Sequence, residues 1–156
     1  MKAIDLIHRP GVTIQVQATV TEAAALMEQA GVGCLAVVDG DTLRGVVTDR
    51  DLVCRVLARR LSTEIRIDSV MSAPALTVAG DAELRSVTDL FRTHAVRRAP
   101  VVHDGECVGM ITVDDLIVVL TRDLADIVQP VTAELIFAQH DSPLPVAIGD
   151  TSPKPT

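Results

Sequence analysis

The feature that most constrains the fold of this chain is an internal duplication. When the sequence is shifted by 64 residues against itself, residues 10–52 align with residues 74–116 without a gap. The identical pairs are Pro10/Pro74, Thr13/Thr77, Ala18/Ala82, Leu26/Leu90, Val32/Val96, Val37/Val101, Val38/Val102, Gly45/Gly109, Thr48/Thr112, Asp51/Asp115 and Leu52/Leu116. Because apolar, turn and polar positions all stay in register, the repeat indicates one structural unit that is used twice.

Each copy predicts the same β-α-β-β-α unit. Aliphatic residues recur at helical spacing in one segment and form short strand-like runs in the others. The expected strands are Val12–Val16, Cys34–Val38 and Leu43–Thr48 in the first copy, and Leu76–Val78, Arg98–Val102 and Cys107–Thr112 in the second. The expected helices are Val20–Ala30 and Ala82–His94, with a last helix beginning near Asp49 and near Val113. The fold class is therefore predicted as α/β: two tandem pseudo-symmetric units packed sheet against sheet, with helices outside.

Local signals mark the ends of these elements. An Asp-Gly step at residues 39–40 and again at 104–105 separates two apolar runs, which is typical of a tight hairpin. Gly31 is expected to end the first helix, and Asp81 is expected to cap the start of the corresponding helix in the second copy. A short helical turn at residues 67–71 mirrors residues 4–7.

The repeat also suggests the organisation of the whole chain. We expect a first unit at residues 1–60, a linker at 61–66 and a second unit at 67–128. Pro130 is expected to interrupt the last helix, and residues 129–140 then form a C-terminal extension. Residues 141–156 are rich in Ser, Pro, Gly and Asp, and this composition predicts a disordered tail.

Composition and charge argue against nucleic acid as a partner. The net charge is −7, and a negative field repels the phosphate backbone. The chain has no Trp, no Tyr and only two Phe residues, so it lacks the aromatic side chains on which single-stranded bases stack.

Cysteine usage and hydropathy favour a cytoplasmic protein. The three cysteines are an odd number and form no Cys-x-x-Cys pair, which suits a reducing compartment. The N-terminal residues lack the apolar run of an export signal, and no stretch approaches 18 consecutive apolar residues. We expect no membrane association.

The pattern that points most clearly to a function is Gly-h-h-Thr-x-x-Asp, in which h is apolar. It occurs at Gly45–Asp51 and Gly109–Asp115, where a strand is expected to end and a helix to begin. Such a junction presents free backbone N–H groups, and a carboxylate one turn later can accept both hydroxyls of a ribose. The alternative interpretation is that the Thr and Asp residues only cap the helix.

The two copies resemble CBS domains, the small modules named after cystathionine β-synthase, and two in tandem resemble a CBS pair, or Bateman module. The resemblance covers about residues 1–128 and depends on the Thr-x-x-Asp motifs, the run Arg97–Val102 and the short turns before each copy. It implies a cleft that binds AMP, ADP, ATP or S-adenosylmethionine as a regulatory ligand, with no required cofactor. By position it implicates Thr48, Asp51, Pro100, Val101, Thr112 and Asp115.

The copies differ in their basic residues. The second copy enters its central strand with Arg97 and Arg98, where the first has Gly33 and Cys34. Arg50, which lies inside the first motif, is also a candidate nucleotide-binding residue, together with Arg97 and Arg98. If one nucleotide site is competent, these residues favour the site served by the two arginines. The alternative is that the arginines pair with surface carboxylates such as Asp114.

Other reactive residues suggest no catalysis. The four histidines are scattered without metal-ligand spacing, and the cysteines fall in apolar surroundings typical of core residues. No nucleophile elbow, P-loop or nucleophile with a base is present. Arg55, Arg59, Arg60 and Arg66 form a basic cluster that is expected to be solvated, or to meet phosphates or an acidic partner.

These observations predict a non-enzymatic regulatory module that binds an adenine nucleotide or adenosyl ligand between its two copies. The resemblance implies a homodimer built as a flat disc of four units. Since no catalytic or transport domain is recognisable in the sequence, the regulated partner is expected to be a separate protein. The alternative function is a ligand-free scaffold whose motifs serve only as helix caps.

Overall fold

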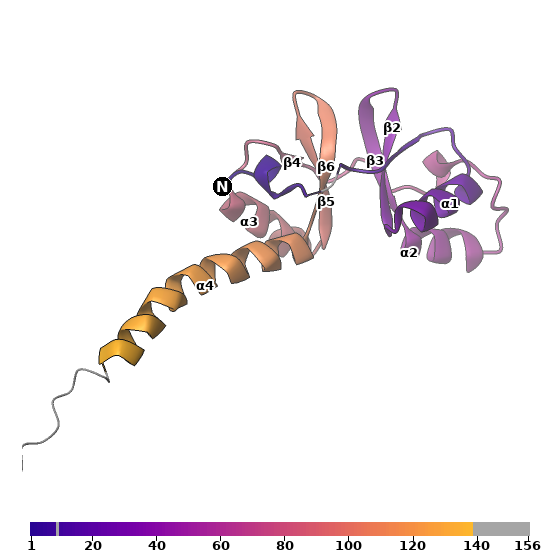
Figure 1. Ribbon diagram of the computed structural model, residues 1–156. Coiled ribbons are helices and arrows are strands. Elements are labelled where there is room, and N and C mark those ends of the chain that lie inside the picture. The colour runs from indigo at the N-terminus through magenta and orange to yellow at the C-terminus, as the bar shows by residue number, and fades with distance from the viewer. Residues whose placement is uncertain (9, 139–156) are drawn as a thin grey trace, which may run out of the picture. The chain divides into compact units, whose positions relative to one another are not determined.

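Two three-stranded sheets lie next to each other in the computed structural model, which describes residues 1–8 and 10–138 (Figure 1). The first sheet contains β1 (Thr13–Gln15), β2 (Cys34–Asp39) and β3 (Thr42–Thr48), and the second contains β4 (Val78–Ala79), β5 (Arg98–His103) and β6 (Glu106–Thr112). In each sheet the first strand pairs in parallel and the third pairs antiparallel with the central strand. A register shift falls at Val37/Val38 and again at Val101/Val102, so the two copies share even their irregularities.

The helix between the first and second strands of each copy lies on the outer face of its sheet (Figure 1). The helices are α1 (Val20–Ala30), α2 (Asp49–Leu52), α3 (Leu84–His94) and α4 (Val113–Ala138), and α2 continues as a π-helical turn, η2 (Val53–Leu57). Two short 3-10 turns precede the copies, η1 (Ala3–Leu6) and η3 (Ile67–Ser69). The predicted α/β class and the order β-α-β-β-α are confirmed.

Local sequence accounts for the ends of most elements. Thr19 caps α1 by accepting from the Glu22 N–H, while the Glu22 carboxylate accepts from the Thr19 N–H. Gly31 ends α1 in the left-handed region with φ of 64°, as predicted. The hairpin glycine Gly105 has φ of 87°, a conformation that glycine adopts without steric cost.

The start of α3 differs from the prediction. The helix begins at Leu84 rather than Ala82, and Glu83 rather than Asp81 occupies the N-cap position. Glu83 is held in extended backbone by a bridge to Lys2, and the Leu84 N–H bonds the Met1 carbonyl at 3.3 Å. This long-range pairing delays the helix by two residues, which a local capping signal does not reveal.

The prediction that Pro130 interrupts the last helix is wrong, because α4 runs through it to Ala138. Pro130 thus lies inside the helix, where it removes one N–H donor. Residues 120–138 belong to a unit separate from residues 1–119. The predicted disordered tail at 141–156 lies outside the described residues, as do residues 139–140.

The short turns η1 and η3 are exchanged between the copies. Ala3 and Leu6 of η1 are buried in the core of the second copy, beside Val78, Val101 and Ile111. Two backbone hydrogen bonds hold this turn there, from the Ala3 N–H to the Ala82 carbonyl at 2.8 Å and from the Ile4 N–H to the Gly80 carbonyl at 2.9 Å.

The other turn completes the exchange. Ile67 and Val70 belong to the core of the first copy, and the Ile67 N–H donates to the Ala18 carbonyl at 2.8 Å. The chain therefore crosses between the two cores twice, once after η1 and once after η3. Among the described residues, no helix is long and apolar enough to cross a membrane.

Candidate functional site

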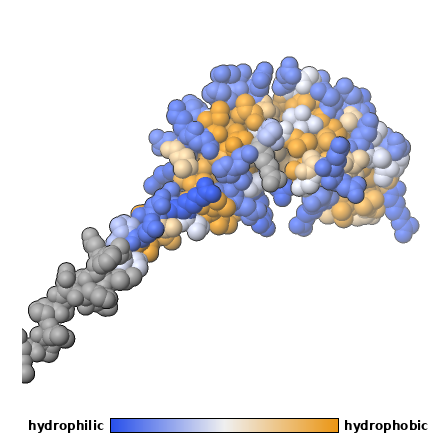
Figure 2. Space-filling model, in the orientation of Figure 1, coloured by the Kyte–Doolittle hydropathy of each residue, from blue (hydrophilic) through white to orange (hydrophobic). Residues whose placement is uncertain are grey.

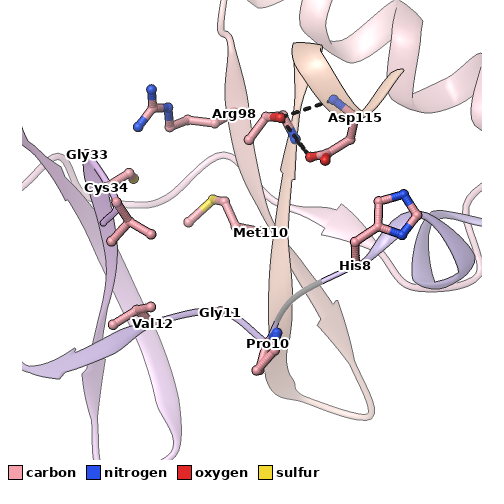
Figure 3. A pocket seen from close by; sticks show the side chains of 11 residues that line it. His8, Pro10, Gly11, Val12, Gly33, Cys34, Arg98, Met110 and Asp115 are labelled. Carbon is pink, nitrogen blue, oxygen red and sulfur yellow. Dashed lines mark hydrogen bonds between the residues drawn. The ribbon is translucent and has the colours of Figure 1, made fainter. Parts of the chain in front are cut away.

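Two clefts lie between the copies, one beside each Thr-x-x-Asp motif. The Thr112 cleft has a volume of about 430 Å³ and is lined by His8, Pro10, Gly11, Val12, Val32, Gly33, Cys34, Arg98, Met110, Thr112 and Asp115 (Figure 3). The Thr48 cleft has a volume of about 460 Å³ and is lined by Cys34, Val46, Thr48, Asp49, Arg50, Ser72, Pro74, Ala75, Leu76, Val96, Arg97, Arg98 and Pro100. Both volumes are in the range of small-molecule sites.

The repeat relates the two clefts. Adding 64 to each first-copy residue of the Thr112 cleft gives a residue that lines the Thr48 cleft. Each cleft thus combines the Thr-x-x-Asp motif of one copy with two segments of the other copy. One is the crossing segment that leads to its first strand, at residues 10–12 or 72–76, and the other is the start of its central strand, at residues 32–34 or 96–98. Cys34 and Arg98, which are equivalent in the two copies, line both clefts.

The motif glycines allow the crossing segments to approach. A Cβ atom on Gly45 would lie 2.6 Å from the Ser72 carbonyl oxygen, and one on Gly109 would lie 2.6 Å from the Ile7 side chain. The Val46 N–H donates to the Ser72 carbonyl at 3.0 Å at this contact. Glycine at position 45 is therefore required by the backbone contact with Ser72, whereas a side chain at position 109 would require the Ile7 side chain to shift.

Both motifs form capping boxes at the start of a helix. The Asp51 Oδ2 atom accepts from the Thr48 N–H and hydroxyl at 2.9 Å each. The Asp115 Oδ2 atom accepts from the Thr112 N–H at 2.8 Å and hydroxyl at 2.7 Å (Figure 3). One oxygen of each carboxylate is thus used to orient the motif, as the capping interpretation predicts.

The second carboxylate oxygen distinguishes the copies. Asp51 Oδ1 forms an ion pair with Arg55 at 3.2 Å. Asp115 Oδ1 has no hydrogen-bond or ion-pair partner within residues 1–8, 10–130 and 132. Asp115 also lines its cleft, whereas Asp51 lies beside the Thr48 cleft without lining it.

The basic side chains gather mainly on the Thr48 cleft. Arg50 and Arg97 line that cleft alone, and Arg98 lines both. In the part of the chain that the structure describes, neither Arg97 nor Arg98 forms an ion pair, and Asp114 is not their partner. The arginines therefore remain available to an anionic ligand.

The structure separates residues that the sequence placed together. Pro100 lines the Thr48 cleft, but Val101 has no exposed surface and lies in the core of the second copy. Asp115 and Arg97 occupy different clefts. Side chains alternate along a strand, so neighbours such as Pro100 and Val101 face opposite sides.

Sequence reasoning missed His8, Met110 and the crossing segments as parts of the clefts. Met110 extends from β6 toward Cys34, and Pro10 to Val12 pass below it in the view of Figure 3. The aligned prolines at 10 and 74 were the available signal, but nothing in the sequence placed them beside the motif of the other copy.

Cys34 is a buried thiol at the centre of the two clefts. Burial raises its pKa to about 11, although the nearby Arg98 guanidinium opposes that shift. At pH 8 only about one thiol in a thousand is then ionised, and the thiolate is the reactive form.

This pKa predicts selective labelling by iodoacetamide. At pH 8 we expect the exposed Cys54 to be alkylated and Cys34 to remain unmodified, with Cys34 labelling rising as the pH approaches 11. Peptide mass spectrometry over a pH series measures both rates in one sample. Equal labelling of Cys34 and Cys54 at pH 8 would contradict the burial of the Cys34 thiol.

The described residues contain no group of three or more His, Cys, Asp and Glu side chains that could hold a metal ion. The predicted basic cluster is partly paired, since Arg55 contacts Asp51 and Arg66 contacts Asp68.

Comparison with known proteins identifies relatives of the duplicated part. The model of the CBS domain family matches residues 3–58 and 67–122. An uncharacterised Bacillus subtilis protein, YlbB, is 40% identical over 99 residues, which cover 62% of this chain and 67% of that protein.

Solved structures share the arrangement. A Burkholderia ambifaria protein with CBS domains superposes with a TM-score of 0.71 and 28% identity, over 79% of this chain and 96% of that one. A Pyrobaculum aerophilum CBS domain protein in complex with AMP superposes with a TM-score of 0.69 and 26% identity, over 74% of this chain and 89% of that one.

Proposed function

The chain belongs to the CBS-domain family, and from this premise we propose that it is a regulatory module that binds an adenine nucleotide or adenosyl ligand in a cleft between its two copies. The observation that carries the proposal is the presence on the same cleft of Asp115, whose Oδ1 atom has no partner among the described residues, and Arg98, which forms no ion pair with them. A carboxylate accepts ribose hydroxyls, and a guanidinium binds phosphate.

The apolar walls of the clefts suit a purine ring. Val12, Val32 and Met110 line the Thr112 cleft together with Pro10, and apolar surface with a few polar groups is typical of cofactor sites. The relative that was solved in complex with AMP supports adenine as the base. The same support extends to ADP, ATP and S-adenosylmethionine, which share the adenosine part.

Ligand binding can produce a signal because residues of both copies line each cleft. Because a ligand contacts both copies, its affinity depends on the arrangement of one copy against the other. A ligand that prefers one arrangement shifts the population toward it. A separate partner protein that recognises that arrangement is then regulated without any reaction on the module itself.

The competing function is a ligand-free scaffold. It is favoured by the capping boxes, because Thr48 and Asp51, like Thr112 and Asp115, already satisfy each other without a ligand. In that case the motifs contribute only to the stability of the helix starts.

A thermal-shift panel separates these two functions. The purified protein is heated with AMP, ADP, ATP, S-adenosylmethionine and, as a control for the base, GTP. A ligand at one hundred times its Kd adds about 2.7 kcal/mol to the free energy of unfolding, which raises the Tm by a few degrees. A rise with adenine ligands but not with GTP supports the sensor, and an unchanged Tm across the panel supports the scaffold.

We also propose a homodimer built on the second helix of each copy. Val53 and Ile117 occupy equivalent positions and are 52% and 56% exposed, and Leu57 is 60% exposed. Apolar surface interrupts the hydrophilic surface in the view of Figure 2. Apolar side chains that are exposed on the equivalent helices of both repeat units favour burial against a second chain.

The dimer predicts that Ile117→Asp yields a monomer. A charged side chain at a buried interface lacks a partner and opposes association, whereas Ile117 is exposed within the chain and contributes little to its own core. Analytical ultracentrifugation measures the mass, with Thr93→Asp on the exposed side of α3 as the control. A wild-type monomer, or a dimer that persists in Ile117→Asp, would contradict this interface.

We propose that the protein is cytoplasmic. Its three cysteines, Cys34, Cys54 and Cys107, are free thiols, which suits a reducing compartment.

A further inference from the structure

We infer that Arg55 withdraws the Asp51 carboxylate from ligand binding, so that each chain binds one nucleotide, with its ribose on Asp115 in the Thr112 cleft. This inference rests on the proposed function. The pseudo-symmetry of the two clefts would by itself suggest two equal nucleotide sites per chain. We infer instead that only the Thr112 cleft binds a nucleotide.

Arg55 is held in place by three contacts. Its Nη2 atom lies 3.2 Å from Asp51 Oδ1 and donates to the Ser72 hydroxyl at 3.0 Å, and its Nη1 atom donates to the Val70 carbonyl at 2.7 Å. Ser72 itself lines the Thr48 cleft. The Arg55 guanidinium therefore joins the Asp51 carboxylate to residues 70–72, which follow η3 and reach the Thr48 cleft at Ser72.

This arrangement leaves Asp51 poorly suited to a ribose. A vicinal diol offers two hydroxyl donors, and a carboxylate oxygen accepts about two hydrogen bonds. Asp51 Oδ2 already accepts two bonds from Thr48, and Oδ1 faces Arg55. The Asp51 side chain is only 15% exposed, so a ligand would have to displace the arginine to reach it.

The second copy lacks this obstruction. The residue equivalent to Arg55 is Val119, which is buried and has no charge. Asp115 Oδ2 is occupied by Thr112 just as in the first copy, but Oδ1 has no partner within the described ranges, and Asp115 lines the Thr112 cleft (Figure 3). The presence of arginine at position 55 and of valine at the equivalent position 119 thus accounts for the difference between the two motif carboxylates.

The basic residues alone would favour the Thr48 cleft, whereas the available carboxylate, Asp115, lies in the Thr112 cleft. Arg50 and Arg97 line only the Thr48 cleft, while the Thr112 cleft has Arg98. A single phosphate needs one guanidinium, whereas the ribose needs an available carboxylate oxygen. The availability of the carboxylate decides between the clefts.

Equilibrium dialysis with labelled AMP tests the inference through stoichiometry. We expect one AMP per chain in the wild type, two in Arg55→Val, which places the second copy's residue in the first, and one in Arg55→Val combined with Asp115→Asn. Arg55→Met keeps the aliphatic stem, so it replaces Arg55→Val if the latter melts at a lower temperature. Asp51→Asn alone is expected to leave wild-type binding unchanged.

The outcomes distinguish the inference from the proposed function. Two AMP per chain in the wild type, or one per chain in both Arg55 variants, overturns the inference and leaves the module a nucleotide sensor. Loss of binding in Asp51→Asn with full binding in Asp115→Asn overturns the assignment of the cleft. Absence of AMP binding in every variant contradicts both the inference and the sensor function.

Discussion

Leu6→Ala is expected to destabilise the second copy, although Leu6 precedes the first copy in sequence. The side chain is 1% exposed and lies in the core with Val78, Val101 and Ile111. Replacing a buried leucine with alanine removes apolar contacts and leaves a cavity, at a cost of about 2–5 kcal/mol in the free energy of unfolding. Urea denaturation measures the loss.

Hydrogen exchange shows where the loss falls. Because η1 packs on the second sheet, the amides of β5 and β6 should exchange faster in Leu6→Ala, while those of β2 and β3 change less. Ile67→Ala is the matched variant, since Ile67 is fully buried in the core of the first copy. Faster exchange of β2 and β3 in Leu6→Ala would contradict the exchange of turns between the copies.

Asp115→Asn is expected to weaken adenine nucleotide binding by about 10–100-fold. The substitution removes the negative charge and replaces one acceptor oxygen with an N–H₂ donor. Hydrogen bonds to charged groups contribute about 1.5–3 kcal/mol, and each 1.4 kcal/mol corresponds to a tenfold change in Kd. Fluorescence titration with a labelled adenine nucleotide measures the Kd of the wild type and the variant.

The stability of Asp115→Asn serves as its control. Asparagine keeps an acceptor for the Thr112 N–H, so the Tm should fall by no more than a few degrees. Unchanged affinity in Asp115→Asn would mean that no ribose lies on this carboxylate. A large fall in Tm would show that the residue acts mainly as a structural cap.

The duplication allowed the fold to be predicted nearly element by element, because the same hydrophobic and turn pattern occurs twice. The hairpins follow from the Asp-Gly steps, and the end of α1 follows from Gly31. The start of α3 could not be predicted from Asp81, because the bridge between Lys2 and Glu83 joins residues far apart in the sequence. Long-range pairing overrode a local capping preference.

The exchange of η1 and η3 could not be predicted, because the alignment of two copies is the same whichever core each turn enters. Ile67 and Ala3 read as apolar residues of their own copies, yet each is buried in the other one. For the same reason the sequence could not show that Thr112 shares a cleft with Pro10 or that Thr48 shares one with Arg97.

The candidate site was predicted in its residue types and incompletely in its geometry. Thr48, Thr112 and Asp115 line the two clefts, and their part in binding a ligand stays a prediction. The contacts of Arg55 were not predicted, since a basic residue one helical turn after an aspartate usually forms an exposed pair of little consequence. Its contacts with Val70 and Ser72 appear only when the crossing segment is folded beside it.

Isothermal titration calorimetry of the wild-type protein with AMP, ADP, ATP and S-adenosylmethionine tests the central claim most directly. The account predicts saturable binding of at least one of these ligands, with one site per chain and no heat from GTP at the same concentration. Absence of saturable heat with all four adenine ligands at millimolar concentration would contradict the sensor function and favour the scaffold.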